Sequence, residues 1–342
     1  MRTSRDNIAG SAARKIIPAA AMLALSAVML STSTYAWFTM NKEVKMTGLA
    51  MSATTGEGIE IALASVSDSK AISAPSGDHP EDDDMGWKSA VVVGDYYEKI
   101  GKLKPASSID GQNLYDATDA SNGGQTANNF VKIDLDTAGT AEDAKKMAEL
   151  TMKASLSETN SGDPAPEIGT DGRVGYYVDI PVYLRTTKAA GDTTKGPIYC
   201  KLIIKDNTTD SSSTNKDLYK SVRVAFVPTA EGSSSTVNIF GVNSDYYSPN
   251  QAVSGTTAKS AVTVNTDVVT DGDAFTTNDG AETGLEIPFA SGTDKYGHLD
   301  FVVRVWIEGE SSFCKDATSG QSWNIDLAFS LEKEFAGSGS ST

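Results

Sequence analysis

Carboxylate side chains in two acidic segments have the spacing in this chain that best fits metal chemistry. The segment TDGDAFTTND contains Asp271, Asp273 and Asp279, and residues 81–84 are four consecutive carboxylates. An acidic loop of this kind can wrap around a hard cation such as calcium, which prefers oxygen ligands. Neither segment matches the calcium-loop pattern D-x-[DN]-x-[DN]-G. We therefore expect a solvated acidic loop, with a calcium site at the three aspartates as the alternative.

Groups that could catalyse a reaction are few. The two histidines of the chain, His79 and His298, lie far apart in the sequence. The sequence contains no H-E-x-x-H zinc helix, no G-x-S-x-G nucleophile elbow, no Walker loop and no G-x-G-x-x-G segment. Acidic residues are too numerous for spacing alone to select a pair of glycosidase carboxylates. The sequence therefore predicts a protein that is not an enzyme and, apart from a possible calcium ion, has no cofactor.

The N-terminal sequence predicts export. Four basic residues precede an apolar run at residues 16–30, IIPAAAMLALSAVML, and small hydroxyl residues follow it. This order of charged, apolar and small residues is that of a secretory signal. The apolar run is shorter than the roughly 20 residues that span a bilayer core. We expect residues 1–36 to be a signal peptide cut between Ala36 and Trp37, with a retained membrane anchor as the alternative.

The strongly acidic composition limits the possible partners. The formal net charge is −16, and residues 1–36 hold four basic residues and one acidic residue, so their removal would make the chain more acidic still. Binding to nucleic acid through its phosphates requires positive charge. The composition therefore predicts that the protein does not bind nucleic acid, and it suits a soluble protein outside the cell.

The two cysteines suggest one disulfide in an exported chain. Cys200 lies in the strand-like segment PIYCKLII, and Cys314 follows a second such segment, FVVRVWIEG. In an oxidising compartment an even pair of cysteines is commonly bonded. In the chain-entropy model, closing so long a loop contributes roughly 4–5 kcal/mol to stability. We expect a Cys200–Cys314 bond, with two free thiols as the alternative.

Short alternating segments predict an all-β fold. Segments rich in Val, Ile, Tyr, Phe and Thr recur along the chain, and Gly, Asp, Asn or Ser bounds each of them. In EVKMTGLAMSA the alternation shifts at Gly48, as at a β-bulge. In LDFVVRVWIEG, Val302, Arg304, Trp306 and Glu308 alternate with apolar residues, which indicates a strand with one buried face. We predict a jelly-roll-like β-sandwich at residues 37–335, after the N-terminal signal helix.

Three kinds of segment depart from the strand pattern. TAEDAKKMAELTMKASL has the spacing of an amphipathic helix at about residues 141–156, so we expect one or two short helices in the fold. Long Gly-, Ser-, Asp- and Asn-rich segments are expected to be surface loops. The tail, residues 336–342, is expected to be disordered.

The leader junction resembles that of the TasA/camelysin family. Thr34, Tyr35, Ala36, Trp37 and Phe38 match the Thr–aromatic–Ala site, followed by an aromatic, that members share. The resemblance implies a jelly-roll protein that is exported by a Gram-positive cell, cut by a dedicated signal peptidase, and built into biofilm-matrix fibres. The metalloprotease activity described for camelysin is not carried over, because the zinc motif is missing.

In fibres of this kind, the resemblance implies, the N-terminal strand of one copy completes the sheet of the next copy. Such donor-strand exchange needs a β-prone segment that is apolar on one face. The segment at about residues 37–51 meets this requirement with Trp37, Phe38, Val44, Met46, Leu49 and Met51. Other copies of the chain are then the expected partner, in a homopolymer. The alternative is that this strand pairs within its own sandwich and the protein stays a monomer.

A second function of a different class also fits the sequence. A secreted or membrane-anchored surface module could bind carbohydrate, or mediate adhesion, through exposed aromatic rings. Trp87 and three Tyr-Tyr pairs are the candidate rings: Tyr96–Tyr97, Tyr176–Tyr177 and Tyr246–Tyr247. Both functions place the protein outside the cell, at the cell surface or in the biofilm matrix.

Overall fold

The structure is a computed structural model of the whole chain. It describes residues 45–53, 58–63, 86–108, 110–116, 132–133, 147–152, 174–208, 216–228, 237–241, 267–268, 274–277, 280–309, 311, 313–314 and 321–333. These residues belong to the compact unit Lys42–Thr342. The expected signal peptide, residues 1–36, and the tail, residues 336–342, lie outside them. No helix among the residues so described is both long enough and apolar enough to span a membrane.

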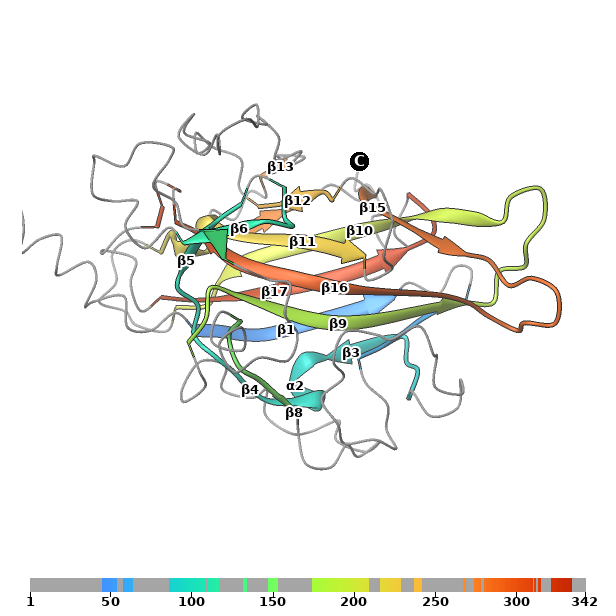
Figure 1. The fold of residues 1–342 in the computed structure, drawn as a ribbon, viewed down its shortest axis with the longest axis horizontal. Helices are drawn as coiled ribbons and strands as arrows, with labels where there is room; N and C mark the ends of the chain where they lie inside the picture. The colour runs from blue at the N-terminus through green and yellow to red at the C-terminus, as the bar shows by residue number, and fades with distance from the viewer. Residues whose placement is uncertain are drawn as a thin grey trace, which may run out of the picture. The chain divides into compact units, whose positions relative to one another are not determined.

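The described residues form an all-β sandwich, as predicted. One sheet has seven strands in the order β13-β14-β10-β17-β1-β3, and β15 also pairs with β10. Its strands are β1 (Lys45–Ala53), β3 (Ala90–Val92), β10 (Lys195–Asp206), β13 (Asp267–Val268), β14 (Ala274–Thr276), β15 (Ala281–Pro288) and β17 (Ser322–Ser330). Figure 1 shows β1 between β17 and β3.

The second sheet has eight strands in the order β12-β11-β16-β5-β6-β7, and β9 pairs with both β16 and β2. Its strands are β2 (Ile59–Ala62), β5 (Pro105–Ser107), β6 (Leu114–Asp116), β7 (Lys132–Ile133), β9 (Tyr177–Thr186), β11 (Val222–Pro228), β12 (Ile239–Phe240) and β16 (Gly297–Glu308). Strands β4 (Tyr97–Ile100) and β8 (Leu150–Met152) form a separate pair. The described residues contain two short helical turns, α2 (Val93–Tyr96) and the 3₁₀ turn η5 (Leu218–Ser221).

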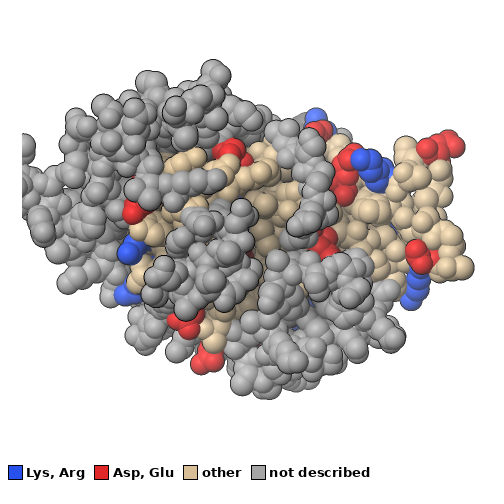
Figure 2. Space-filling model, in the orientation of Figure 1, with Lys and Arg blue, Asp and Glu red and all other residues tan. Residues whose placement is uncertain are grey.

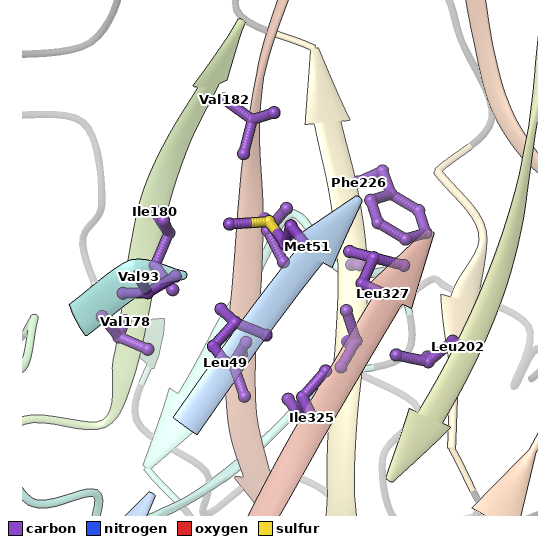
Figure 3. Close-up of a cluster of buried hydrophobic side chains, with 14 of the residues drawn as sticks. Leu49, Met51, Val93, Val178, Ile180, Val182, Leu202, Phe226, Ile325 and Leu327 are labelled. Carbon is purple, nitrogen blue, oxygen red and sulfur yellow. The ribbon is translucent and has the colours of Figure 1, made fainter. Parts of the chain in front are cut away.

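Side chains from both sheets fill the space between them. Phe226 of β11 and Phe301 of β16 pack edge-to-face against Phe329 of β17, with ring centroids 5.7 and 5.4 Å from it. This is the geometry that aromatic pairs prefer. Figure 3 shows the neighbouring part of the core, where Leu49 and Met51 of β1 face side chains of the other sheet. The alternation of apolar residues thus gives each strand one face in a common core.

Strand β16 is buried on both faces, which corrects the expectation of one buried face. The four side chains expected on its solvent side are at most 8 % exposed: Val302, Arg304, Trp306 and Glu308. The turn after β5 covers them, because the Arg304 guanidinium donates to the Gly111 and Gln112 carbonyls and the Ser107 hydroxyl donates to the Glu308 carboxylate. This face of β16 is therefore buried, and it holds two charged side chains, Arg304 and Glu308.

The prediction of a helix at about residues 141–156 is wrong for those of its residues that the structure describes. Leu150–Met152 form β8, which pairs antiparallel with β4, and Met147 forms a parallel bridge with Tyr177. Residues 141–146 and 153–156 lie outside the described part of the chain. The helical spacing of apolar residues was overridden because cross-strand partners were available for this segment.

Candidate functional site

Several of the predicted site residues lie outside the described residues. These are the metal candidates Asp271, Asp273 and Asp279, the cleavage-site residues Ala36 and Trp37, and the arm residues Phe38 and Val44. Within the described ranges no group of three or more His, Cys, Asp or Glu side chains could hold a metal ion. The calcium site and the signal cleavage therefore remain predictions from the sequence.

The predicted disulfide is not formed. Cys200 and Cys314 are both thiols in the structure. Cys200 lies in β10 of the seven-stranded sheet, fully buried, whereas Cys314 follows β16, which belongs to the other sheet. The two strand-like segments of the sequence are thus in different sheets. Burial raises the pKa of the Cys200 thiol well above its usual value, and this keeps the side chain in its unreactive protonated form.

The described part of the predicted arm is strand β1. It runs parallel to β17 from Lys45, opposite Ser322, to Ala53, opposite Phe329, and it runs antiparallel to β3. The register shifts between Met46 and Leu49, which confirms the irregularity predicted at Gly48. In the single chain, the arm from Lys45 onward therefore lies in its own sheet, which was the alternative to a free arm.

Strand β1 contributes to the core but is paired unevenly. Leu49 and Met51 are fully buried between the sheets (Figure 3). On one side β17 follows β1 over its whole length, whereas on the other side β3 reaches only Ala50–Ser52. The two partners of β1 are β17, which is distant in the sequence, and β3, which has only three residues. The position of β1 in the sheet is thus bordered by β17 along one side and by three residues of β3 along the other.

The segment Trp87–Val92, here called the strap, connects the two sheets beside β1. Lys88 exchanges a pair of backbone hydrogen bonds with Ile61 of β2, at 2.9 and 3.0 Å. One residue further on, the Ser89 carbonyl accepts a 2.7 Å bond from the Ala53 amide, and Ala90–Val92 pair with β1 as β3. The strap therefore borders one sheet with its first half and the other sheet with its second half.

The strap begins at a cluster around Arg185. The Arg185 guanidinium lies between the rings of Trp87 and Tyr296, 4.6 and 4.0 Å from their centroids. Its Nε and Nη2 donate to Glu60 Oε2 at 2.7 and 2.6 Å. His298 lies beside both rings, with its centroid 6.1 Å from Trp87 and 6.2 Å from Tyr296. Four segments of the chain, including β2, β9 and β16, meet at this one cation.

A second arginine cluster lies at the other end of the β9–β16 pair. Arg304 donates two hydrogen bonds to the Asp179 carboxylate, at 2.8 and 2.7 Å, and its guanidinium lies 5.2 Å from the Tyr177 ring. Burial alone would lower the pKa of Arg304, but the Asp179 charge and its hydrogen bond hold that pKa above its usual value. Arg304 therefore stays charged, and the Asp179 carboxylate balances its charge within the cluster.

Both arginine clusters were missed in the sequence. Arg185 and Arg304 sit in alternating strands, where a charged residue indicates a solvent-facing position. Their carboxylate partners, Glu60 and Asp179, are 125 residues away in each case. An arginine within an apolar strand was the only signal, and it does not identify the partner.

Of the candidate rings for carbohydrate, Tyr176 is half-buried and its hydroxyl donates to Asp116 at 2.7 Å, and Tyr246–Tyr247 lie outside the described residues. Tyr96, Tyr97 and Tyr177 are buried. Burial, followed by the nearby Asp95 charge, raises the pKa of Tyr96 to about 12. Trp87 is half-buried against Arg185, so that one face of its ring is already occupied. On the face of the molecule in Figure 2, acidic and basic side chains of the described residues are interspersed.

Comparisons with known protein families, with curated proteins and with solved structures found no match for this chain.

Proposed function

We propose that this chain is an exported structural protein that assembles into extracellular fibres, and that copies join by exchanging strand β1. In the assembly, β1 of one copy occupies the position between β17 and β3 in the sheet of the next copy. The observation that carries this proposal is the position of β1: it is the first strand of the sandwich, and its main partner, β17, is the last described strand.

Exchange of β1 changes the free energy little, because the exchanged strand makes the same contacts in the neighbour as in its own chain. Leu49 and Met51 would fill the same buried positions, and the seven register pairs with β17 would re-form. The balance then depends on protein concentration and on the conformation of the connection between β1 and β2. A strand near one end of a domain can be exchanged without threading the rest of the chain.

A head-to-tail exchange does not close on itself. Each copy gives β1 to one neighbour and receives β1 from another, so the contact is heterologous and extends into a filament unless the rotation closes a ring. The main-chain hydrogen bonds of an added strand give affinity, and the pockets for its alternate side chains give specificity. The acidic chain is suited to this role outside the cell, because charge repulsion opposes non-specific association.

A disulfide ladder tests the proposal directly. Ser52 of β1 and Ala90 of β3 are directly opposed in register, and directly opposed residues in antiparallel strands are close enough for a disulfide. The variant Ser52→Cys/Ala90→Cys, with Cys314→Ala, is concentrated without residues 1–36 and then oxidised. Exchanged strands will give a ladder of covalent oligomers on non-reducing gels, and negative-stain images of the same sample will show filaments.

The matched control places the cysteines on strands that are not exchanged. Lys205 of β10 and Asn324 of β17 are also opposed in register, so Lys205→Cys/Asn324→Cys will oxidise within one chain and run as a monomer. Cys200 can stay in both variants because its thiol is buried. Filaments that run as monomers in the Ser52→Cys/Ala90→Cys variant would disprove exchange, and dispersed particles at high concentration would disprove fibre formation.

A further inference from the structure

We propose that the strap, Trp87–Val92, is a latch that controls the release of β1, and that stacking of Trp87 on Arg185 holds the latch closed. This inference rests on the proposed exchange for its biological role. The opening of the latch itself can be measured in the single chain. The strap is the only described segment that pairs with β1 on the side away from β17.

The side of β1 next to β17 cannot open easily. Strand β17 pairs with β1 on one side and with β10 over eight register positions on the other. It also carries Ile325, Leu327 and Phe329 into the core. Displacing β17 would therefore break the centre of the seven-stranded sheet, with a cost close to that of global unfolding.

The strap side of β1 has few bonds to break. Only three strap residues pair with β1 in β3, and among them only Val91 is buried, whereas Val92 is 37 % exposed. Short edge segments with exposed backbone open at much lower free energy than central strands do. Once the strap lifts, β1 becomes an edge strand whose backbone pairs with β17 alone, while Leu49 and Met51 still hold it in the core.

The strap is fixed at its first residue by contacts with the opposite sheet. Trp87 lies on the Arg185 guanidinium, and Lys88 is bonded to Ile61 of β2 through both backbone groups. Arg185 is itself fixed by the Glu60 carboxylate and by Tyr296. The cluster therefore acts on β1 indirectly: it holds Trp87, and Trp87 holds the strap across the edge of β1.

The chain offers a closely matched pair of variants. Trp87→Ala and Tyr296→Ala each remove one aromatic ring from the same guanidinium, at 4.6 and 4.0 Å. Only Trp87 belongs to the strap, so only Trp87→Ala releases the latch. If the cluster only stabilised the fold and did not hold a latch, the two variants would change amide exchange in β1 equally.

Hydrogen exchange of the dilute single chain measures the opening. In Trp87→Ala the amides of Leu49–Ala53 and of the strap will exchange about tenfold faster than in the parent chain, which is the effect expected from losing one cation–π contact of a partly buried pair. In Tyr296→Ala the same amides will change at most about twofold, because the strap keeps its own contact with Arg185. Amides of β10 will be unchanged in both variants.

Equal acceleration of the β1 amides in the two variants, or acceleration of β1 and β10 together, would overturn the latch. If Trp87→Ala does not fold, Lys88→Pro provides the second test. Proline removes the amide that donates to Ile61 and changes no side chain of the Arg185 cluster, so it should also accelerate exchange in β1 selectively.

The two proposals can fail separately. If Trp87→Ala accelerates exchange in β1 but the Ser52→Cys/Ala90→Cys chain gives no ladder, the latch stands and fibre assembly through β1 is wrong. If the Ser52→Cys/Ala90→Cys chain gives a ladder, and Trp87→Ala neither shortens the time needed for assembly nor accelerates the β1 amides, the exchange stands and the latch is wrong.

Discussion

Arg185 and Arg304 are bound by the same kinds of group at the two ends of the β9–β16 pair and are equally buried, but their carboxylate partners are covered to different extents. Each pairs with one carboxylate and contacts aromatic rings. Arg304 also donates to two backbone carbonyls of the covering turn, and its partner Asp179 is mostly buried. The Glu60 partner of Arg185 is 36 % exposed at its side chain.

The comparison shows that the same ion pair can have different roles at different depths. A buried pair contributes little by its formation but costs much when one partner is removed, because the other charge is left without water. A pair whose carboxylate is partly exposed is weaker, since water can solvate that carboxylate when the arginine is removed. We therefore interpret the Arg304 cluster as a fixed part of the fold and the Arg185 cluster as an adjustable contact that holds the strap.

The largest expected effect is the loss of Arg304. Arg304→Ala will lower the free energy of unfolding by about 3–5 kcal/mol, because it leaves the Asp179 carboxylate and the covering carbonyls buried without their donor. Urea denaturation followed by circular dichroism measures this. The double variant Arg304→Met/Asp179→Leu, which removes both charges, should regain much of the loss. A single-variant loss below about 1 kcal/mol would show that water reaches this cluster, and the contrast between the two ends would disappear.

A smaller effect is expected at the other end of the pair. Arg185→Ala will lower the free energy of unfolding by about 1–2 kcal/mol, from the loss of two ring contacts and a half-hydrated ion pair. The same denaturation experiment gives the value. A loss as large as that of Arg304→Ala would contradict an adjustable role for this cluster.

The pH dependence of Tyr183, which lies between the two clusters, sharpens the comparison. Burial, followed by the Asp300 charge, raises the pKa of Tyr183 above its usual value, so the folded state retains a proton that the unfolded state loses. The stability that this group contributes is complete below the ordinary tyrosine pKa of about 10 and declines as the pH rises above it. Between pH 8 and pH 11 the free energy of unfolding will therefore fall by about 1 kcal/mol less in Tyr183→Phe than in the parent chain. Equal losses would mean that water reaches the face between the clusters.

The smallest effect is that of salt. Raising the salt concentration from 0.1 to 1 M will reduce the stability difference between the parent chain and Arg185→Ala by a few tenths of a kcal/mol, because screening acts on exposed charges. The corresponding difference for Arg304→Ala will stay constant, since a buried pair is screened much less. Parallel urea titrations at the two salt concentrations provide the measurement, and equal salt dependence would contradict the assigned depths.

Local patterns in the sequence predicted the strands better than they predicted the contacts between strands. Alternation predicted the all-β sandwich, and the irregularity at Gly48 appears as a register shift between Met46 and Leu49. The helical spacing near Leu150 failed because β4 supplied a cross-strand partner, which no local pattern reveals.

The candidate site depended even more on distant residues. The apolar face of β1 could be predicted from alternation, but its partner β17 could not, nor could the strap that borders it. The predicted Cys200–Cys314 bond failed for the same reason, since the sequence does not show which strands share a sheet. Contacts between residues that are more than a hundred positions apart are set by the whole fold.

The parallel pairing of β1 with β17 has a consequence for the order of folding. Lys45 lies opposite Ser322, so the centre of the seven-stranded sheet cannot be completed until β17 has been synthesised. The search for such a distant partner carries a large loop-closure entropy and makes folding slow. A late-closing sheet of this kind leaves β1 of a nascent chain without its main partner until β17 has been made.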